Sequence, residues 1–247
     1  MENIANAKIH ILFYKNADLT EKTDLPEKTD LPENALLYFS ALRKQKFLRF
    51  TNPRVKYQQA AAELAVCAAM KEAGFPFTPP EYAYDELGRP CMRNGFLSIS
   101  HTNNAAACIV FSEPVGLDIE YDRRIDSKLA KRILNSRELS EFAKCENQNE
   151  FLIKTWIAKE SFLKLTGIGL RNGMQQTDFY IKADRICGQD GKNCSIRQDK
   201  ISHSFKTDKK SPDTMRTYYI SLCSESPVKT EFIIYNSFAD IIDYLKS

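Results

Sequence analysis

The stretch of sequence that most constrains the fold reads GLDIE and occupies residues 116–120. Its apolar and acidic residues alternate, which is typical of a short strand with one buried face. Leu117 and Ile119 then point into the core, and Asp118 and Glu120 point together to the other face. Two carboxylates on one face repel each other unless a positive charge lies between them, and a hard divalent cation meets that need. Two solvated acids on an exposed strand face are the alternative interpretation.

A strongly apolar segment follows later in the chain and reads FLIKTWIAKESFLKL over residues 151–165. This pattern predicts a buried helix. Residues four apart lie on one helical face, so Trp156, Glu160 and Lys164 form a single stripe, with Lys159 beside it. A buried acid needs a partner. A simple ion pair between Glu160 and Lys164 meets that need as well as a functional site does.

A third polar motif precedes the strand and reads SISH over residues 98–101. Ser100 and His101 end a predicted strand and lead into a loop of Thr102, Asn103 and Asn104. Short hydrogen-bond donors of this kind suit an anion. A histidine that only makes local hydrogen bonds is the alternative interpretation.

The rest of the chain predicts strands and helices in both halves. We expect strands over residues 8–14, 96–100, 105–111, 115–120, 177–183, 217–223 and 231–235. We expect helices over residues 34–50, 57–73, 127–134, 150–166 and 238–245, and a further one starting near 135. A direct hexapeptide repeat at residues 21–32 predicts an exposed loop, and the polar stretch at 188–214 predicts a long loop that carries a poor hairpin. The expected fold class is α+β, with two similar lobes at residues 1–113 and 114–247.

The composition is that of an ordinary globular protein, with 43% hydrophobic and 27% charged residues. A net charge of +3 gives little reason to expect a nucleic-acid partner. The 7 cysteines include no CxxC pair, and there are only 3 histidines, so neither a disulfide framework nor a zinc site is expected. The first residues do not read as a secretory signal, and no apolar run is long enough to span a membrane. We therefore expect a cytoplasmic protein without a membrane segment.

The order of the motifs carries a family resemblance. Along the chain come Gly88–Pro90, Ser98–His101, Gly116–Glu120, Trp156–Lys164 and Gly167–Gly169. This order resembles the 4′-phosphopantetheinyl transferase superfamily, and its long, surfactin-type members more closely than its short trimeric ones. The two family hallmarks, a G-[IV]-D-[IV]-E strand and a W-x-x-K-E-[SA]-x-x-K helix, are complete here. The resemblance extends over residues 35–183 and, more loosely, to residue 247.

The resemblance implies two α/β lobes related by a pseudo-twofold axis, with coenzyme A in the cleft between them. It implies magnesium as the cofactor, held by Asp118, Glu120 and Glu160 against the pyrophosphate of coenzyme A. The remaining matched positions would contact coenzyme A itself: Arg89 and Pro90 at the adenine, Ser100 and His101 at the phosphates, Lys164 at the pyrophosphate, and Lys159 near the phosphates.

The implied activity is transfer of 4′-phosphopantetheine from coenzyme A to a serine of an apo acyl or peptidyl carrier protein, with release of 3′,5′-ADP. Glu160 would take the serine proton, and Lys164 would stabilise the leaving diphosphate. The family's long members imply a monomer. Carrier proteins are acidic, so a basic segment would steer them. The candidates are Arg43, Lys44, Lys46 and Arg49 in one segment, and residues 206–210 in another.

Two positions depart from the family pattern or have a second interpretation. Many relatives carry an arginine for the 3′-phosphate where this chain has Gln58. Either Lys56 or Arg54 would serve instead, or the contact with the 3′-phosphate would be weaker. Glu138 matches an acid of some long members, but its spacing from Asn135 favours a helix-capping role. Two other functions remain open, namely a different magnesium-dependent phosphoryl-group hydrolase and a non-catalytic module that binds coenzyme A or a carrier.

Overall fold

The computed structural model describes residues 4–15, 31, 33–86, 88–169, 174–180, 183–188, 191–205 and 214–247. The hexapeptide repeat, apart from Leu31, and the basic segment 206–210 lie outside the described residues. The strands are β1 (Asn6–Phe13), β2 (Ala83–Tyr84), β3 (Pro90–Cys91), β4 (Phe96–Thr102), β5 (Ala105–Phe111), β6 (Val115–Tyr121), β7 (Thr177–Tyr180), β8 (Arg185–Gly188), β9 (Asn193–Phe205), β10 (Thr214–Ser224) and β11 (Lys229–Tyr235).

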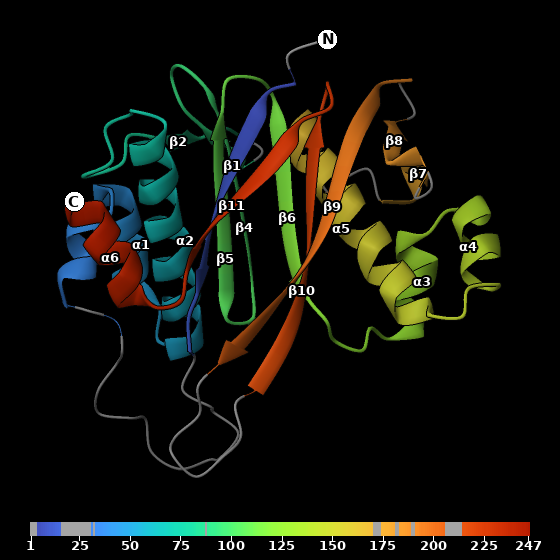
Figure 1. Cartoon of the computed structure of the whole chain (residues 1–247), viewed down its shortest axis with the longest axis horizontal. Coiled ribbons are helices and arrows are strands. Elements are labelled where there is room, and N and C mark those ends of the chain that lie inside the picture. The colour runs from blue at the N-terminus through green and yellow to red at the C-terminus, as the bar shows by residue number, and fades with distance from the viewer. Residues whose placement is uncertain are drawn as a thin grey trace.

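The described helices complete an α+β fold, as expected from the sequence (Figure 1). They are α1 (Ala41–Arg49), α2 (Pro53–Glu72), α3 (Ser127–Ile133), α4 (Ser136–Phe142), α5 (Gln148–Thr166) and α6 (Phe238–Lys246), with 3-10 turns η1 (Glu33–Tyr38) and η3 (Met174–Gln176). None of them is both long and apolar enough to cross a membrane.

Two sheets form the centre of the molecule, and each is covered by its own helices. The first has the order β11-β1-β5-β4, and the second has the order β6-β10-β9-β8-β7. Helices α1, α2 and α6 lie on one side of the molecule, and α3, α4 and α5 lie on the other (Figure 1). One apolar core lies under α2 and α6, a second lies under α5, and a third lies between the sheets.

The two sheets repeat one arrangement of strands. In the first, β1 pairs antiparallel with β5, which pairs antiparallel with β4. In the second, β6 pairs antiparallel with β10, which pairs antiparallel with β9. In both halves the long helix, α2 or α5, lies in sequence between the first of these strands and the other two. Strand β11 is outside this pattern, because it pairs parallel with β1 in the first sheet.

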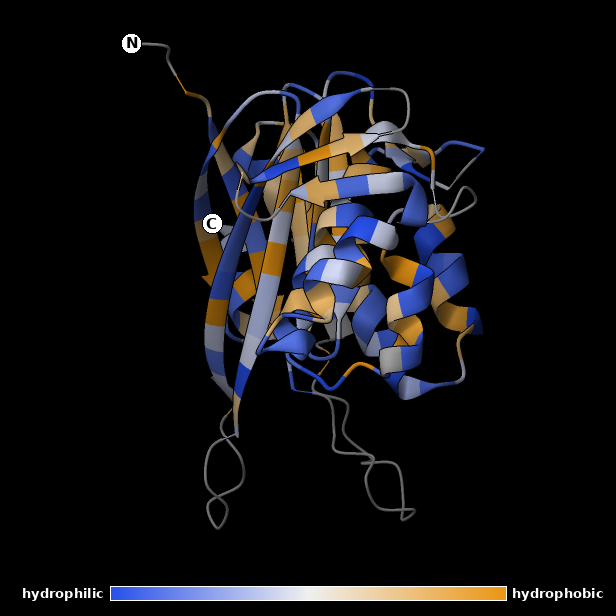
Figure 2. Ribbon diagram, turned by 90° about the vertical axis from the view of Figure 1, so that its right-hand side faces the viewer, coloured by the Kyte–Doolittle hydropathy of each residue, from blue (hydrophilic) through white to orange (hydrophobic). Residues whose placement is uncertain are grey.

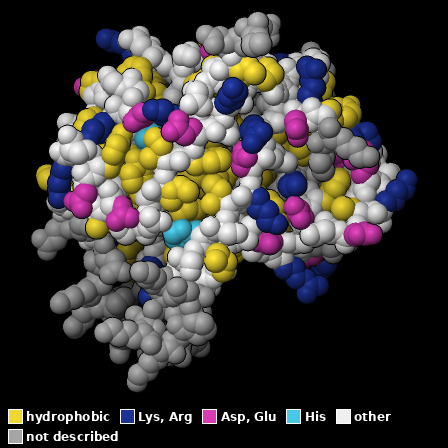
Figure 3. Space-filling model, viewed as in Figure 1, with side chains coloured by type: hydrophobic (Ala, Val, Ile, Leu, Met, Phe, Trp, Pro, Cys, Tyr) yellow, Lys and Arg dark blue, Asp and Glu magenta, His cyan; other side chains and the backbone are white. Residues whose placement is uncertain are grey.

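Hydropathy follows this layered arrangement. The strands at the centre of the view are largely hydrophobic, whereas the helices that face the viewer mix hydrophobic with many hydrophilic residues (Figure 2). On the face seen in Figure 1, hydrophobic side chains gather near the middle, with charged side chains around them (Figure 3). Ile234 of β11 is 41% exposed on the surface.

The close approach of β6 to α5 depends on Gly116. A Cβ atom added at this glycine would lie 1.8 Å from the Ser161 carbonyl oxygen and 2.6 Å from the Leu165 backbone nitrogen. Any larger residue therefore forces the strand and the helix apart. This contact sets the distance between the GLDIE strand and the helix that carries Glu160 and Lys164.

Most of the expected elements are confirmed, but the poor hairpin expected within a long loop over residues 188–214 is a regular pair of long strands in the described residues. Residues Asn193–Phe205 form the long strand β9, which pairs with β10 from Ser195 to Phe205. Its burial alternates only in part, and many of its outward residues are polar. The expected helix over residues 34–50 is divided into η1 and α1, and Ser40 caps the start of α1.

We predict that Gly116→Ala lowers the free energy of unfolding by about 3 kcal/mol or more, because the added methyl group meets backbone atoms that cannot rotate away. The measurement is urea unfolding followed by circular dichroism. Gly95→Ala is the control, since its added Cβ lies 3.3 Å from the nearest atom, the Phe111 carbonyl oxygen. Equal losses in the two variants would contradict the proposed role of the β6–α5 contact.

Candidate active site

The two sheets meet where β4 lies beside β6, and hydroxyl groups of β4 bridge the junction. The Leu117 amide donates to Ser98 Oγ at 2.8 Å, and the Ile119 amide donates to Ser100 Oγ at 3.2 Å. Ser100 Oγ in turn donates to Asp118 Oδ1 at 2.7 Å. Side chains thus replace a backbone ladder at this junction, and they fix the orientation of the Asp118 carboxylate.

The same arrangement recurs two residues further along both strands. Thr102 Oγ1 donates to Glu120 Oε1, which also accepts from the Tyr121 amide at 3.0 Å. Arg123 Nη2 lies 3.4 Å from Glu120 Oε2. The structure therefore places Asp118 and Glu120 in one row facing β4, as strand alternation predicts.

Lys164 joins α5 to this row. Its ammonium group donates to Asp118 Oδ1 at 2.7 Å and to the Leu117 carbonyl oxygen at 2.9 Å. Asp118 is buried, so its carboxylate needs this positive partner. Lys164 therefore pairs with Asp118 of the strand. The simple ion-pair interpretation expects Lys164 to pair with Glu160 instead.

Glu160 lies one helical turn before Lys164 and keeps a carboxylate that is poorly compensated. Burial and the nearby Asp118 carboxylate raise the pKa of Glu160 to about 7, and Lys164 only partly offsets them. A carboxyl group that titrates near neutral pH can accept a proton in a reaction. It also marks a place where one more positive charge would be favourable.

A cavity of about 280 Å³ opens beside these groups. It brings together the expected Arg89, Pro90, His101, Glu160 and Lys164. The desolvating surroundings of His101 and the nearby Lys164 ammonium group lower the pKa of its imidazole. The lining residues come from several elements, and they are Arg43, Ala62, Tyr84, Gly88, Arg89, Pro90, Leu97, Ser98, Ile99, His101, Glu160, Leu163, Lys164, Gly167 and Gly169.

Arg89 crosses the end of α5 at one wall of the cavity. Its Nε donates to Asp85 Oδ2 at 3.1 Å, and its guanidinium group lies against Gly167. Gly167 caps α5 in the left-handed conformation with φ of 72°, so it permits this close approach. This contact brings Arg89, one of the residues expected at the adenine, to the C-terminal end of the helix that carries Glu160 and Lys164.

The expectation that Lys159 contacts the phosphates is wrong. This side chain is fully buried and is not among the described residues that line the cavity, and its Nζ lies 2.5 Å from Glu138 Oε2. It also donates to the carbonyl oxygens of Ile133 at 2.9 Å and Met174 at 2.8 Å. Lys159 therefore ties α3, α4 and η3 to α5.

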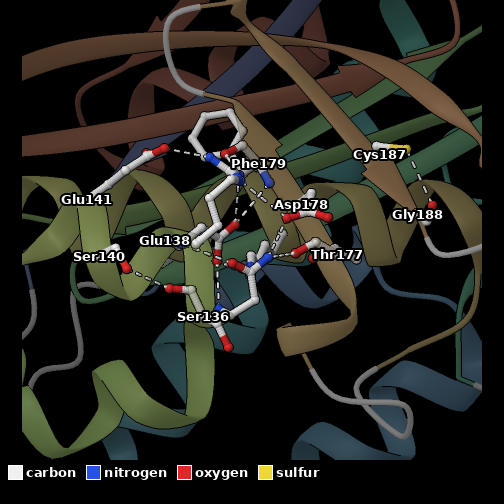
Figure 4. Close-up of polar contacts among 12 residues, drawn as sticks. Ser136, Glu138, Ser140, Glu141, Thr177, Asp178, Phe179, Cys187 and Gly188 are labelled. Atoms are coloured by element: carbon white, nitrogen blue, oxygen red, sulfur yellow. Dashed lines mark hydrogen bonds and ion pairs between the residues drawn. The ribbon is translucent and has the colours of Figure 1, made fainter.

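Glu138 has two structural roles at once. It completes a capping box with Asn135, as the spacing predicts, and its Oε1 accepts from the Phe179 amide at 2.9 Å. Figure 4 shows it pointing from α4 toward β7, near Thr177, Asp178 and Phe179. The acid found here in some long members thus belongs to the packing of the second sheet.

Arg43 lines the cavity, although its sequence context predicts only a place in a basic surface that would steer the carrier. Neither Lys56, Arg54 nor Gln58 is among the described residues that line the cavity, whereas Arg43 is. Its guanidinium carbon lies 5.1 Å from the centre of the Tyr84 ring, which also lines the wall. Only the basic type and helical position of this residue were visible in the sequence.

The carboxylates of Asp118, Glu120 and Glu160 are chemically suited to a hard cation. Their side chains do not converge on a common metal position in this structure. Among the residues described, no three His, Cys, Asp or Glu side chains form a group that could hold a metal ion. Asp118 and Glu160 are nonetheless close enough to raise the pKa of Glu160. Carboxylate oxygens are the ligands that magnesium prefers. The donor set therefore fits magnesium.

Known proteins share this site region. Residues 114–223 match the model of the 4'-phosphopantetheinyl transferase superfamily. The 4'-phosphopantetheinyl transferase Sfp of Bacillus subtilis (strain 168) is 27% identical over 54% of this chain and 62% of its own length. The 4'-phosphopantetheinyl transferase gsp of Aneurinibacillus migulanus is 27% identical over 52% of this chain and 56% of its own length. A holo-[acyl-carrier-protein] synthase of Vibrio vulnificus (strain CMCP6) is 35% identical over 28% of this chain and 61% of its own length.

The residues that match the family model, 114–223, contain both the GLDIE strand and the helix that carries Glu160 and Lys164. Within the superfamily the chain is similar to Sfp-type transferases, which confirms the resemblance predicted from its motifs. The match extends over 62% of the length of the Sfp relative, so it covers less than two thirds of that protein.

We predict that Glu160→Gln stabilises the metal-free protein, and increasingly so from about pH 5 to pH 8. The pKa of Glu160 is raised from 4.5 to about 7, so over this interval the folded state holds a proton that the unfolded state has lost. Stability of the unsubstituted protein therefore falls relative to the variant as pH rises, by about 2 kcal/mol for this partly exposed group.

The measurement is urea unfolding in EDTA at several pH values. Glu113→Gln, in the exposed turn between β5 and β6, is the control for a general charge effect. A constant stability difference across the interval would contradict the raised pKa.

We predict that the same substitution at the two lysines of α5 changes the free energy of unfolding to different extents. Lys159→Met leaves Glu138 buried without its cation and lowers the free energy of unfolding by about 3 kcal/mol or more. Lys164→Met costs less stability, because the Lys164 side chain is 30% exposed and water can partly replace it. Urea unfolding measures both losses, and equal losses in the two variants would contradict the buried structural role of Lys159.

Proposed function

We propose that the protein transfers 4′-phosphopantetheine from coenzyme A to a serine of an apo acyl or peptidyl carrier protein and releases 3′,5′-ADP. One observation carries the proposal: Glu160 and Lys164 line a cavity, and Lys164 pairs with Asp118, within the segment that matches the transferase family. The named relatives are 4'-phosphopantetheinyl transferases and a holo-[acyl-carrier-protein] synthase.

The cavity supports coenzyme A as the co-substrate, in a cleft between two lobes related by a pseudo-twofold axis. The repeated strand order of the two sheets supports the axis, and the junction of β4 with β6 would lie near it. We keep the lobes at residues 1–113 and 114–247, with β11 and α6 of the second returning to the first sheet. The cavity draws its lining from both lobes.

Asp118, Glu120 and Glu160 would hold magnesium beside the diphosphate of coenzyme A. The support is the pairing of hard carboxylate ligands with the uncompensated charge at Glu160. When bound, the ion would neutralise negative charge that develops on the leaving diphosphate.

The chain's own residues would bind the co-substrate and move one proton. Arg89, Ser100, His101 and Arg43 would hold its adenine and phosphate groups at the cavity wall. The serine hydroxyl oxygen attacks the β-phosphorus, and the bond from that phosphorus to the bridging oxygen of the diphosphate breaks. The serine proton passes to Glu160, whose raised pKa suits it to accept a proton. Lys164 would offset charge on the departing 3′,5′-ADP.

The protein partner would approach beside α1, whose basic residues suit an acidic carrier. Lys44, Lys46 and Arg49 are exposed there, and no acidic residue interrupts the helix. We propose that the protein acts as a cytoplasmic monomer, without a nucleic-acid or membrane partner, as the resemblance implies.

One assay tests the activity and separates it from other magnesium-dependent chemistry. Apo carrier protein, coenzyme A and magnesium are incubated with the protein, and the intact mass of the carrier is measured. A mass increase equal to one phosphopantetheine supports the transferase. Release of inorganic phosphate, or binding of coenzyme A without any change in the carrier, contradicts it.

We predict that Asp118→Ala and Glu160→Ala each lower turnover by about 100-fold or more in this assay, because the site loses an anionic ligand and, for Glu160, its proton acceptor. Glu113→Ala is the control, since this exposed acid lies in the turn before β6. Near-normal rates in both site variants would refute the assignment of the site.

A further inference from the structure

Helix α1 brings Arg43 to the cavity, yet the helix itself is weakly anchored. Phe47 is its one buried side chain, and the other side chains of Ala41–Arg49 are exposed or half-buried. A helix held by a single apolar contact would leave a cavity residue poorly positioned. Some other interaction must therefore fix Arg43.

Polar groups of α2 and of the β2 region supply that interaction. Arg43 Nε lies 3.3 Å from Glu63 Oε2 and donates to the Tyr82 hydroxyl at 3.1 Å, and its Nη1 donates to Gln59 Oε1 at 3.1 Å. The Tyr82 hydroxyl in turn donates to Glu63 Oε2 at 2.6 Å. Four side chains thus form one closed network beside the cavity.

Glu63 is the only acid in this network and the least accessible member. It is 1% exposed, although it lies on the first long helix among alanines of the core. A buried carboxylate is costly unless it is paired, and here the pair is Arg43. The same guanidinium group lies beside Tyr84 in the cavity wall, where it can meet a ligand.

We propose that Glu63 is a positioning residue, which acts through Arg43 to aim its guanidinium group at a phosphate of the nucleotide co-substrate in the cavity. The inference rests on the proposed function, since it takes coenzyme A as the ligand. Glu63 does not touch the ligand. It holds Nε of Arg43 while Gln59 holds Nη1, so the planar group has one fixed orientation.

A double-mutant cycle on the dissociation constant of coenzyme A, measured by calorimetry, tests the proposal. Arg43→Ala should weaken binding by about 10-fold to 100-fold, the range for a charge-assisted contact. Glu63→Gln should weaken it by about fivefold in the otherwise unchanged protein. In the Arg43→Ala background, Glu63→Gln should have no further effect, because the residue it acts through is absent.

Steady-state kinetics add a result that a merely structural residue would not give. Glu63→Gln should raise KM for coenzyme A and leave KM for the carrier and kcat nearly unchanged. Glu72→Gln is the matched control on the same helix, because its carboxylate pairs with Lys8 at the surface away from the cavity. The control should leave all three constants unchanged.

Tyr82→Phe provides a second variant if Glu63→Gln folds poorly. It removes one hydroxyl from the network and should weaken coenzyme A binding by about twofold to threefold, again only where Arg43 is present. Additive effects in either cycle, or equal losses of affinity for coenzyme A and the carrier, would overturn the proposal. Failure of the unsubstituted protein to bind coenzyme A would instead refute the proposed function.

Discussion

The contact between β6 and α5 at Gly116 is the constraint on which the site depends. A strand and a helix approach closely only where one of them lacks a side chain, and here the missing side chain is at the start of the acidic strand. Two residues later comes Asp118, which is thereby brought within 2.7 Å of Lys164. Gly116 is thus required for packing, and this packing fixes the positions of Asp118 and Glu120.

The two lysines of α5 illustrate how burial assigns different work to similar side chains. Lys159 is sealed among carbonyl groups and Glu138, where it neutralises a buried carboxylate and joins helices. Lys164 is half-buried at the cavity, where its partner Asp118 is itself part of the site. Because Lys164 is engaged by Asp118, it compensates the charge of Glu160 only in part. That imbalance makes the pocket receptive to cations and protons.

Local sequence patterns predicted the strand, the helix and the face that each presents, because alternation and helical spacing depend on neighbouring residues. The partners of single charges were not predictable in this way. Lys159 pairs with Glu138, and Arg43 pairs with Glu63, only in the folded chain. In the sequence, Lys159 therefore looked like a phosphate-binding residue and Arg43 like part of a basic surface. The length and regularity of strand β9 were underestimated for a related reason. Its outward side chains face water, and its polar composition resembles that of a loop.

Strand β11 gives the molecule a dependence between distant parts of the chain. Asn6 pairs with Lys229, and the edge of β1 remains uncovered until that late segment arrives. Helix α6 then covers the apolar side of α2 with Phe238 and Ile241. During synthesis, β1 therefore has an unpaired edge until β11 has been made. Such long-range pairing slows folding, and an unpaired edge favours aggregation. The two sheets look like separable halves, but a cut between them would leave the first without its closing strand.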